Sequence, residues 1–125
     1  KHKMLNNKVK KTSEIKIKVG LNEQNIPIDL KWKASDSEHE RLNDCKSVNI
    51  SIWDPVEKNS LGINLWTVDL TTDEMHSHYF RTLLNFTDSY IRATQNPFAK
   101  EMVQNLCKDL TSKTAEWEES KTKNN

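Results

Sequence analysis

Strict alternation of apolar and polar residues in four separate segments is the feature that most constrains the fold of this chain. The segment "SEIKIKVGL" alternates isoleucine and valine with charged residues, and the alternation recurs in "IPIDLKWKA", "VNISIWD" and "LGINLWT". Because successive side chains of a strand point to opposite faces, each segment predicts a strand with one apolar face. We therefore expect strands over residues 14–21, 26–34, 47–54 and 60–67, with a loop over residues 35–47.

Two segments with helical periodicity follow the predicted strands. "LTTDEM" carries a capping box, in which Thr71 caps a helix and Glu74 returns the hydrogen bond, and this predicts a helix over residues 72–94. Asn96 as N-cap, with Pro97 at the first helical position, predicts a second helix over residues 97–115. Strands and helices in separate runs are typical of an α+β fold. We expect two layers in a single domain over residues 13–115: a four-stranded antiparallel sheet, and two helices packed on one of its faces.

Composition narrows the range of functions. The chain of 125 residues is 34% hydrophobic and 30% charged, and its formal net charge of +1 provides no overall attraction to nucleic acid or membrane. The basic residues 1–12 and the polar residues 116–125 are expected to be solvated tails. Cys45 and Cys107 lack C-x-x-C spacing, which favours a reducing compartment. No apolar run approaches the roughly 18 residues of a membrane helix and no signal peptide is visible, so we expect a cytoplasmic protein without a transmembrane segment.

Two tryptophans occupy unexpected positions in the third and fourth strands. Alternation places Trp53 and Trp66 on the polar face, opposite the isoleucines of the same strands. With a turn over residues 56–59, Gly62 is expected to lie opposite Trp53, which can then lie across the bare backbone. The polar face of the sheet is thus a candidate interaction face, and it collects Trp53, Trp66, Asn49, Ser51, Asn64, Lys16, Lys18, Lys31 and Lys33. The alternative is structural: the tryptophans pack on each other, on lysine stems or beneath the 35–47 loop.

Sites for catalysis, metal ions and cofactors are not expected. Glu74 and His78 have the spacing of a metal pair, but His76 faces elsewhere and no complete ligand set is visible. Asp54 and Asp69 are better explained by a turn and a helix start than as an acid and base. Neither cysteine has an evident catalytic partner. Nucleic-acid binding, in which tryptophans stack bases and lysines contact phosphates, is disfavoured by the few arginines and the near-neutral charge.

Three longer segments resemble the gliding motility-associated GldC family of Bacteroidota. They are "SEIKIKVGLNEQNIPIDLKW", "SIWDPVEKNSLGINLWTVDLTTDEM" and "IRATQN", and the similarity extends from about Ser13 to Leu110. This resemblance implies a small soluble protein linked to gliding motility, with no known enzymatic role.

Two functional hypotheses follow, both without enzymatic activity. The first is an accessory or assembly protein that binds a protein partner, either a component of the gliding machinery or a second copy of itself. The second is a chaperone-like binder of unfolded or exported segments, because strands followed by helices is also the element order of the export chaperone SecB.

Overall fold

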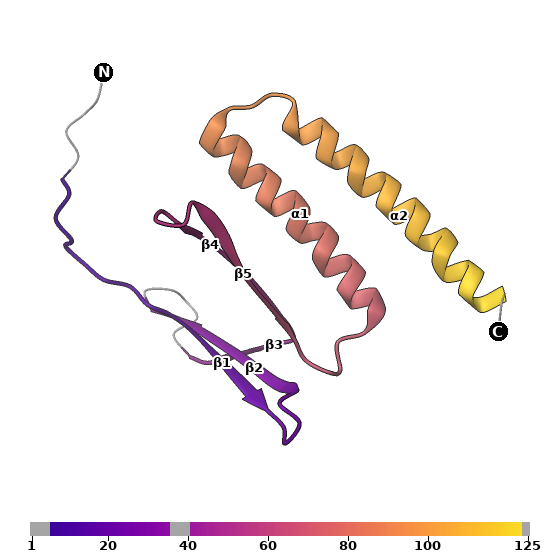
Figure 1. The fold of residues 1–125 in the computed structure, drawn as a ribbon, viewed down its shortest axis with the longest axis horizontal. Helices are drawn as coiled ribbons and strands as arrows, with labels where there is room; N and C mark the ends of the chain where they lie inside the picture. The colour runs from indigo at the N-terminus through magenta and orange to yellow at the C-terminus, as the bar shows by residue number, and fades with distance from the viewer. Residues whose placement is uncertain (1–5, 36–40, 124–125) are drawn as a thin grey trace. The chain divides into compact units, whose positions relative to one another are not determined.

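The computed structural model of the protein describes residues 6–35 and 41–123 (Figure 1). The predicted loop 35–47 and both predicted tails therefore lie partly outside the described residues. The strands are β1 (Ile15–Leu21), β2 (Pro27–Ala34), β3 (Asn43–Cys45), β4 (Ser47–Asp54) and β5 (Asn59–Trp66). The helices are α1 (Thr72–Thr94) and α2 (Ala99–Lys123). The chain forms two compact units, Lys1–Leu70 with the strands and Thr71–Asn125 with the helices, and each is described by itself.

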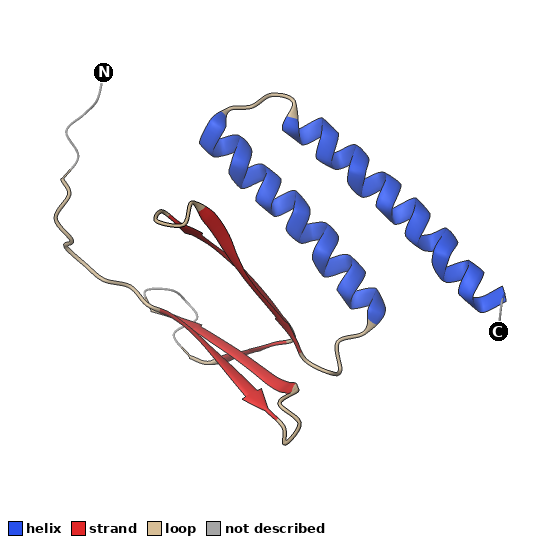
Figure 2. Ribbon diagram, viewed as in Figure 1, coloured by secondary structure: helices blue, strands red, loops and turns tan. Residues whose placement is uncertain are grey.

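The α+β class and the antiparallel pairing are confirmed, but the prediction of one four-stranded sheet is wrong. The first unit holds a three-stranded sheet in the order β1-β2-β3 and a two-stranded sheet formed by β4 and β5 (Figure 2). The reason is a change of partner at Lys46: β2 pairs with the residues before it, and β5 pairs with the residues after it. β3 was expected to be loop because "NDC" is too short and too polar to show alternation.

In the three-stranded sheet, the predicted separation of apolar and charged side chains is confirmed. Ile17 pairs with Trp32 and Val19 pairs with Leu30, so these four side chains share one face. The opposite face carries two directly opposed lysine pairs, Lys16 with Lys33 and Lys18 with Lys31.

The turn between β4 and β5 is one residue earlier than expected. Asp54 accepts hydrogen bonds through Oδ1 from the amides of Val56 (2.8 Å) and Glu57 (3.2 Å), and its carbonyl accepts one from the amide of Lys58 (2.8 Å). Lys58, with φ of 53°, takes the left-handed conformation that Asn59 was expected to allow. Asp54 therefore pairs with Asn59, which shifts the register by two residues. Because side chains repeat every two residues, this shift exchanges cross-strand partners but leaves every side chain on its predicted face.

The two sheets meet at a buried corner. Leu30, paired with Cys45, is 1% exposed, and Thr67 is 3% exposed. The amide of Thr67 donates to the carbonyl of Lys46 (2.9 Å), and the amide of Val68 donates to the carbonyl of Pro27 (3.2 Å). These bonds connect the end of β5 to both sheets, so the corner is the core of the first unit among the described residues.

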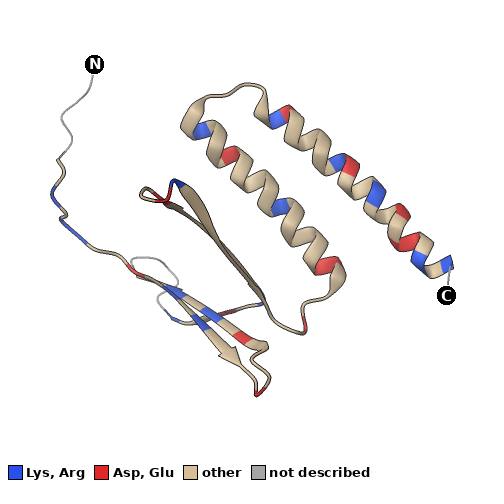
Figure 3. Cartoon of the chain, in the orientation of Figure 1, with Lys and Arg blue, Asp and Glu red and all other residues tan. Residues whose placement is uncertain are grey.

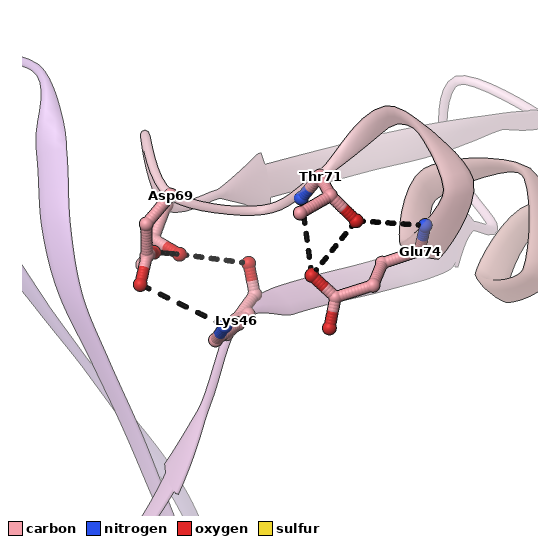
Figure 4. A network of polar contacts seen from close by, with 5 residues as sticks. Lys46, Asp69, Thr71 and Glu74 are labelled. Carbon is pink, nitrogen blue, oxygen red and sulfur yellow. Dashed lines mark hydrogen bonds and ion pairs between the residues drawn. The ribbon is translucent and has the colours of Figure 1, made fainter.

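A small polar network closes the corner. The hydroxyl of Thr67 donates to Asp69 Oδ1 (2.6 Å), and Lys46 Nζ lies 3.7 Å from Asp69 Oδ2 (Figure 4). The hydrogen bond from Thr67, together with the charge of Lys46, lowers the pKa of the Asp69 carboxyl below its ordinary value.

In the second unit, the predicted capping box is confirmed. The amide of Glu74 donates to Thr71 Oγ1 (3.1 Å), and the amide of Thr71 donates to Glu74 Oε1 (3.1 Å), as Figure 4 shows. These bonds satisfy two amides that the first turn of α1 cannot pair internally. At the other end of α1, Gln95 adopts the left-handed conformation that ends the helix.

α2 begins and ends later than predicted. Asn96 does accept a hydrogen bond from the amide of Phe98 (3.1 Å), but the regular helix starts at Ala99 and continues to Lys123 rather than ending at residue 115. Polar pairs within the last turns account for the extension. Lys121 Nζ lies 3.6 Å from the centre of the Trp117 ring, and the same lysine lies 3.6 Å from Glu118. Most of the predicted C-terminal tail is therefore helical.

The two helices form a hairpin with one buried residue, Cys107 on α2. Its thiol lies 4.0 Å from the carbonyl of Phe80 on α1. Because the two units are described separately, the packing of the helices on one sheet face stays a prediction.

We predict that Leu30 is the main side chain holding the corner of the first unit. Leu30→Ala should lower the free energy of unfolding by about 2–5 kcal/mol, because it leaves a cavity in the only fully enclosed site of the described strands. Ile28→Ala is the matched control on the same strand; Ile28 is 52% exposed, so its truncation should cost well under half as much. Denaturant midpoints measured by near-ultraviolet circular dichroism would test this, and equal losses for the two variants would contradict it.

We also predict that Asp69 contributes to stability above its depressed pKa. Its ordinary value is 3.8, and the folded value is lower, so the stabilisation is complete above the ordinary value and is lost as the pH falls through the folded pKa. Thr67→Val should raise the pKa of Asp69, because it removes the hydrogen-bond donor while keeping the side-chain shape. The measurement is carboxyl titration by NMR, with Asp69→Asn to identify the resonance. An Asp69 pKa that is the same in wild type and Thr67→Val would show that the hydrogen bond has no such effect.

Candidate interaction face

The two tryptophans share one face of the β4–β5 sheet but lie at opposite ends of it. Trp53 is opposite Ser60, next to the turn, and Trp66 is opposite Ser47, next to the corner. In register terms the two are six residues apart, or roughly 20 Å at 3.3–3.4 Å per residue. The prediction that Gly62 lies opposite Trp53 is wrong, because the earlier turn pairs Gly62 with Ser51. Mutual packing of the two indoles, the first structural alternative, is excluded by the same separation.

Small polar residues cover the face between the tryptophans. Asn49 pairs with Asn64, and the Asn49 amide group donates to Asn64 Oδ1 (2.7 Å). A methyl group added at Gly62 would meet only the side chain of Asn64, at an ordinary contact distance of 3.5 Å. The centre of the face therefore carries only short, uncharged side chains, with an indole at each end. We call this surface, formed by Trp53, Trp66, Asn49, Ser51 and Asn64 with Ser60 and Gly62, the tryptophan face.

The two indoles differ in their surroundings. Trp66, 48% exposed, lines a shallow hollow together with Ile26, Pro27 and Val68 at the corner. Trp53 is 62% exposed and lies beside the turn, away from that hollow. Trp66 is thus partly covered by neighbouring residues of its own unit, whereas most of the Trp53 side chain is exposed.

The four lysines predicted for the same face belong to the other sheet. Lys16 and Lys18 lie on β1, and Lys31 and Lys33 lie on β2 (Figure 3). Lys31 forms ion pairs with Asp44 on β3 and with Asp29 (3.4 Å). The hydrogen bond to Asp44 and the two nearby carboxylates raise the pKa of Lys31 above its ordinary value. The structure therefore divides the nine predicted residues between two sheets, and Asp44, which the sequence pattern did not indicate, already engages one of the lysines.

The side chains considered for catalysis or metal binding are engaged in local structure. Asp54 organises the β4–β5 turn and Asp69 belongs to the corner, so the structure places them at opposite ends of the two strands. Glu74 is bound in the capping box, and His76 lies 3.5 Å from Glu118 on α2. Within residues 6–35 and 41–123, no three His, Cys, Asp or Glu side chains are grouped as a metal site would require.

The cysteines are separated by the fold. Cys45 is half-buried on β3, and burial raises the pKa of its thiol. Cys107 lines a cleft between α1 and α2. Phe80 and Leu84 form the apolar wall of this cleft, which the sequence pattern did not indicate. The basic residues Arg81 and Lys108 line the same cleft.

Neither α1 nor α2, over the described part of the chain, combines the length and the hydropathy that a membrane-crossing helix requires.

Comparisons with known proteins give one family. The family model described as "Gliding motility-associated protein GldC-like" matches residues 27–116, which extends from β2 into α2 and includes the whole tryptophan face. Lys16 and Lys18 on β1 lie outside the matched residues. Searches of curated proteins and of solved structures returned no match. Because the matched residues are well over half of the chain, and include the "SIWD" and "NLWT" segments that carry the resemblance, the chain belongs to the GldC-like family of gliding motility-associated proteins.

Proposed function

We propose that this protein is a non-enzymatic accessory protein of gliding motility, located in the cytoplasm, that binds another protein through its tryptophan face. The observation that carries the proposal is Trp53, which is 62% exposed on a polar strand face. A tryptophan side chain buries about 150–250 Å² when it is fully covered, so leaving much of it in water forgoes a large favourable term. Tryptophan is also among the residues most enriched at the energetic centres of protein interfaces.

The surroundings of Trp53 suit an anchor residue. Ser60 and Gly62 on β5 and Ser51 on β4 keep the neighbouring surface low, so a partner can reach the flat side of the indole. Trp66 limits the face at the corner, with Ile26 and Val68 adding apolar surface beside it. We infer a partner with an apolar pocket for Trp53 and hydrogen-bonding groups for Asn49 and Asn64.

The proposal that the protein is not an enzyme rests on what the candidate catalytic groups do. Asp54, Asp69 and Glu74 each accept hydrogen bonds, and these define a turn, a corner and a helix cap respectively. Within the strand unit, Asp54 at the turn and Asp69 at the corner lie at opposite ends of the β4–β5 strand pair, so they do not converge on one cleft as catalysis would require.

The chaperone-like alternative would use a different surface. The cleft between α1 and α2 combines the apolar Phe80 and Leu84 with the basic Arg81 and Lys108, a composition that suits an extended apolar segment carrying acidic residues. This function would depend on the helical unit rather than on Trp53, so the experiment below separates the two functions.

We predict that Trp53→Ala keeps the fold but loses partner binding. The free energy of unfolding, obtained from denaturant titration, should change by no more than about 1 kcal/mol, because the indole is largely exposed. The free energy of partner binding should weaken by about 2 kcal/mol or more. A photo-crosslinking amino acid at position 53, expressed in gliding cells, should capture a discrete gliding protein, and Trp53→Ala cells should glide poorly at normal protein abundance.

The matched control is Trp117, which is 54% exposed on α2. Trp117→Ala and a photo-crosslinker at position 117 make the same chemical changes in the other unit. Trp117→Ala cells should glide normally, and the crosslinker at position 117 should not capture the gliding protein. Normal gliding of Trp53→Ala cells would contradict the proposal. Loss of binding to unfolded segments in an Arg81→Glu/Lys108→Glu variant, with Trp53→Ala unaffected, would favour the chaperone-like function instead.

A further inference from the structure

We infer that β5 pairs along its outer edge with β5 of a second copy of this chain, giving a continuous four-stranded sheet β4-β5-β5-β4 with a two-fold axis at Ile63. The inference goes beyond the proposed function, because it concerns the backbone edge of β5 rather than partner binding by Trp53.

The first observation is that β5 has one edge without a strand partner among the described strands, from Ser60 to Trp66; beyond Trp66, at Val68, Pro27 of the same chain bounds this edge. Among the described residues β5 pairs only with β4, and a two-stranded sheet is marginal in water unless something completes it. Two consecutive amides show how the backbone groups are directed: Thr67 donates to Lys46, at the start of β4, and Val68 donates away from β4, to Pro27. Since this direction alternates along an antiparallel strand, Ser60, Gly62, Asn64 and Trp66 direct their N–H and C=O groups away from β4. The amide of Ser60 donates to Asn59 Oδ1 (2.8 Å), so edge pairing exchanges that local bond for one to the second copy.

The second observation is that β5 lacks the features by which natural proteins protect a strand edge. It contains no charged residue and no proline, and its pairing with β4 runs from Asn59 to Trp66 without a bulge (Figure 3). By contrast, the edge strand β1 carries Lys16 and Lys18, and its register is irregular between Gly20 and Leu21. Lysines and bulges are the usual means of preventing edge pairing, so β1 is protected and β5 is not.

The β4 strand is the less suitable edge of the same sheet. Its first four residues are half-buried and it ends in Asp54, whereas the first six residues of β5 are exposed. On the β5 side the edge strand is therefore uncharged, and seven of its eight residues are exposed.

The third observation identifies a second copy as the occupant, because β5 is complementary to itself. Antiparallel pairing about Ile63 sets Leu61 opposite Leu65 and Gly62 opposite Asn64, so the apolar row of each copy continues into the other. In this register the outward backbone groups of Gly62 and Asn64 meet one another, and Ser60 lies opposite Trp66.

The same register brings Trp53 of one chain close to Trp66 of the other. Within one chain Ser60 lies between β4 and the open edge, opposite Trp53. In the pair, Ser60 is also opposite Trp66 of the second copy, so Trp53 of one chain and Trp66 of the other flank one small serine. They are then two strand spacings apart, roughly 10 Å between backbones, instead of the roughly 20 Å that separates them within a chain. The tryptophan face thus becomes two symmetric tryptophan pairs.

The experiment uses the full chain and begins with its mass. Analytical ultracentrifugation over a concentration series should give twice the mass of the chain. Asn64→Lys sets two like charges diagonally across the two-fold axis, about 7–8 Å apart, and should weaken the dimer about tenfold or more. Asn49→Lys is the matched control: it removes the same Asn49–Asn64 hydrogen bond and adds the same charge to the same face, but on β4, and its dimer should be much less affected.

A crosslink tests the register independently of those variants. In a Cys45→Ala/Cys107→Ala background, Ile63→Cys should form an intermolecular disulfide on mild oxidation, because residue 63 faces itself at about 4.5 Å between Cα atoms. Leu61→Cys should not, since the two copies of residue 61 are roughly 13 Å apart in this register.

A monomeric wild type overturns the inference, whether or not the edge then binds an extended peptide of another protein. A dimer that Asn64→Lys does not weaken and Ile63→Cys does not crosslink overturns it too, and so does a crosslink through Gly62→Cys in place of Ile63→Cys. All of these measurements are made without a gliding partner, so they succeed or fail separately from the proposed function.

Discussion

The backbone of Lys46 is the point on which the strand unit depends. Before this residue the chain pairs with β2, and after it the chain pairs with β5, while its own carbonyl accepts the amide of Thr67. This exchange gives the backbone hydrogen-bond partners on both sides of the bend. Leu30 and Thr67 fill the space that the bend encloses, and the ion pair of Lys46 with Asp69 connects the same residue to the segment leading to α1.

Because the third strand is divided at Lys46, β4 and β5 form a sheet of only two strands. Such a sheet has little capacity to bury side chains within itself, and this accounts for the exposure of Trp53 near the turn. Trp66, near the corner, is instead partly sheltered by Ile26 and Pro27. The difference between the two indoles is thus a consequence of their distance from Lys46. The surface that we propose for binding and the edge that we propose for self-association both extend from Trp66, at the corner, toward the turn beside Trp53.

Membership of the GldC-like family supplies a biological setting for that surface. The matched residues include all of β4 and β5 and the helix start with its capping box, but not β1. The tryptophan face therefore lies within the region that defines the family, whereas half of the lysines predicted to accompany it do not.

The α+β class, both faces of the sheets and the start of α1 were predictable from the sequence, because each depends on residues close together in the chain. Alternation placed Ile17, Leu30 and Ile50 on apolar faces, and Thr71 with Glu74 marked the helix start, whatever the distant pairing proved to be. The extension of α2 beyond residue 115 was missed because paired charges, rather than an apolar stripe, maintain it. Only the tertiary structure decided which strand pairs with which, since the change of partner at Lys46 and the formation of β3 leave no periodic signal in "NDCK". It likewise decided that Ser60, not Gly62, faces Trp53: the hydrogen bonds of Asp54 set the turn, and a register shift of two residues changes every partner while leaving the alternation unaltered.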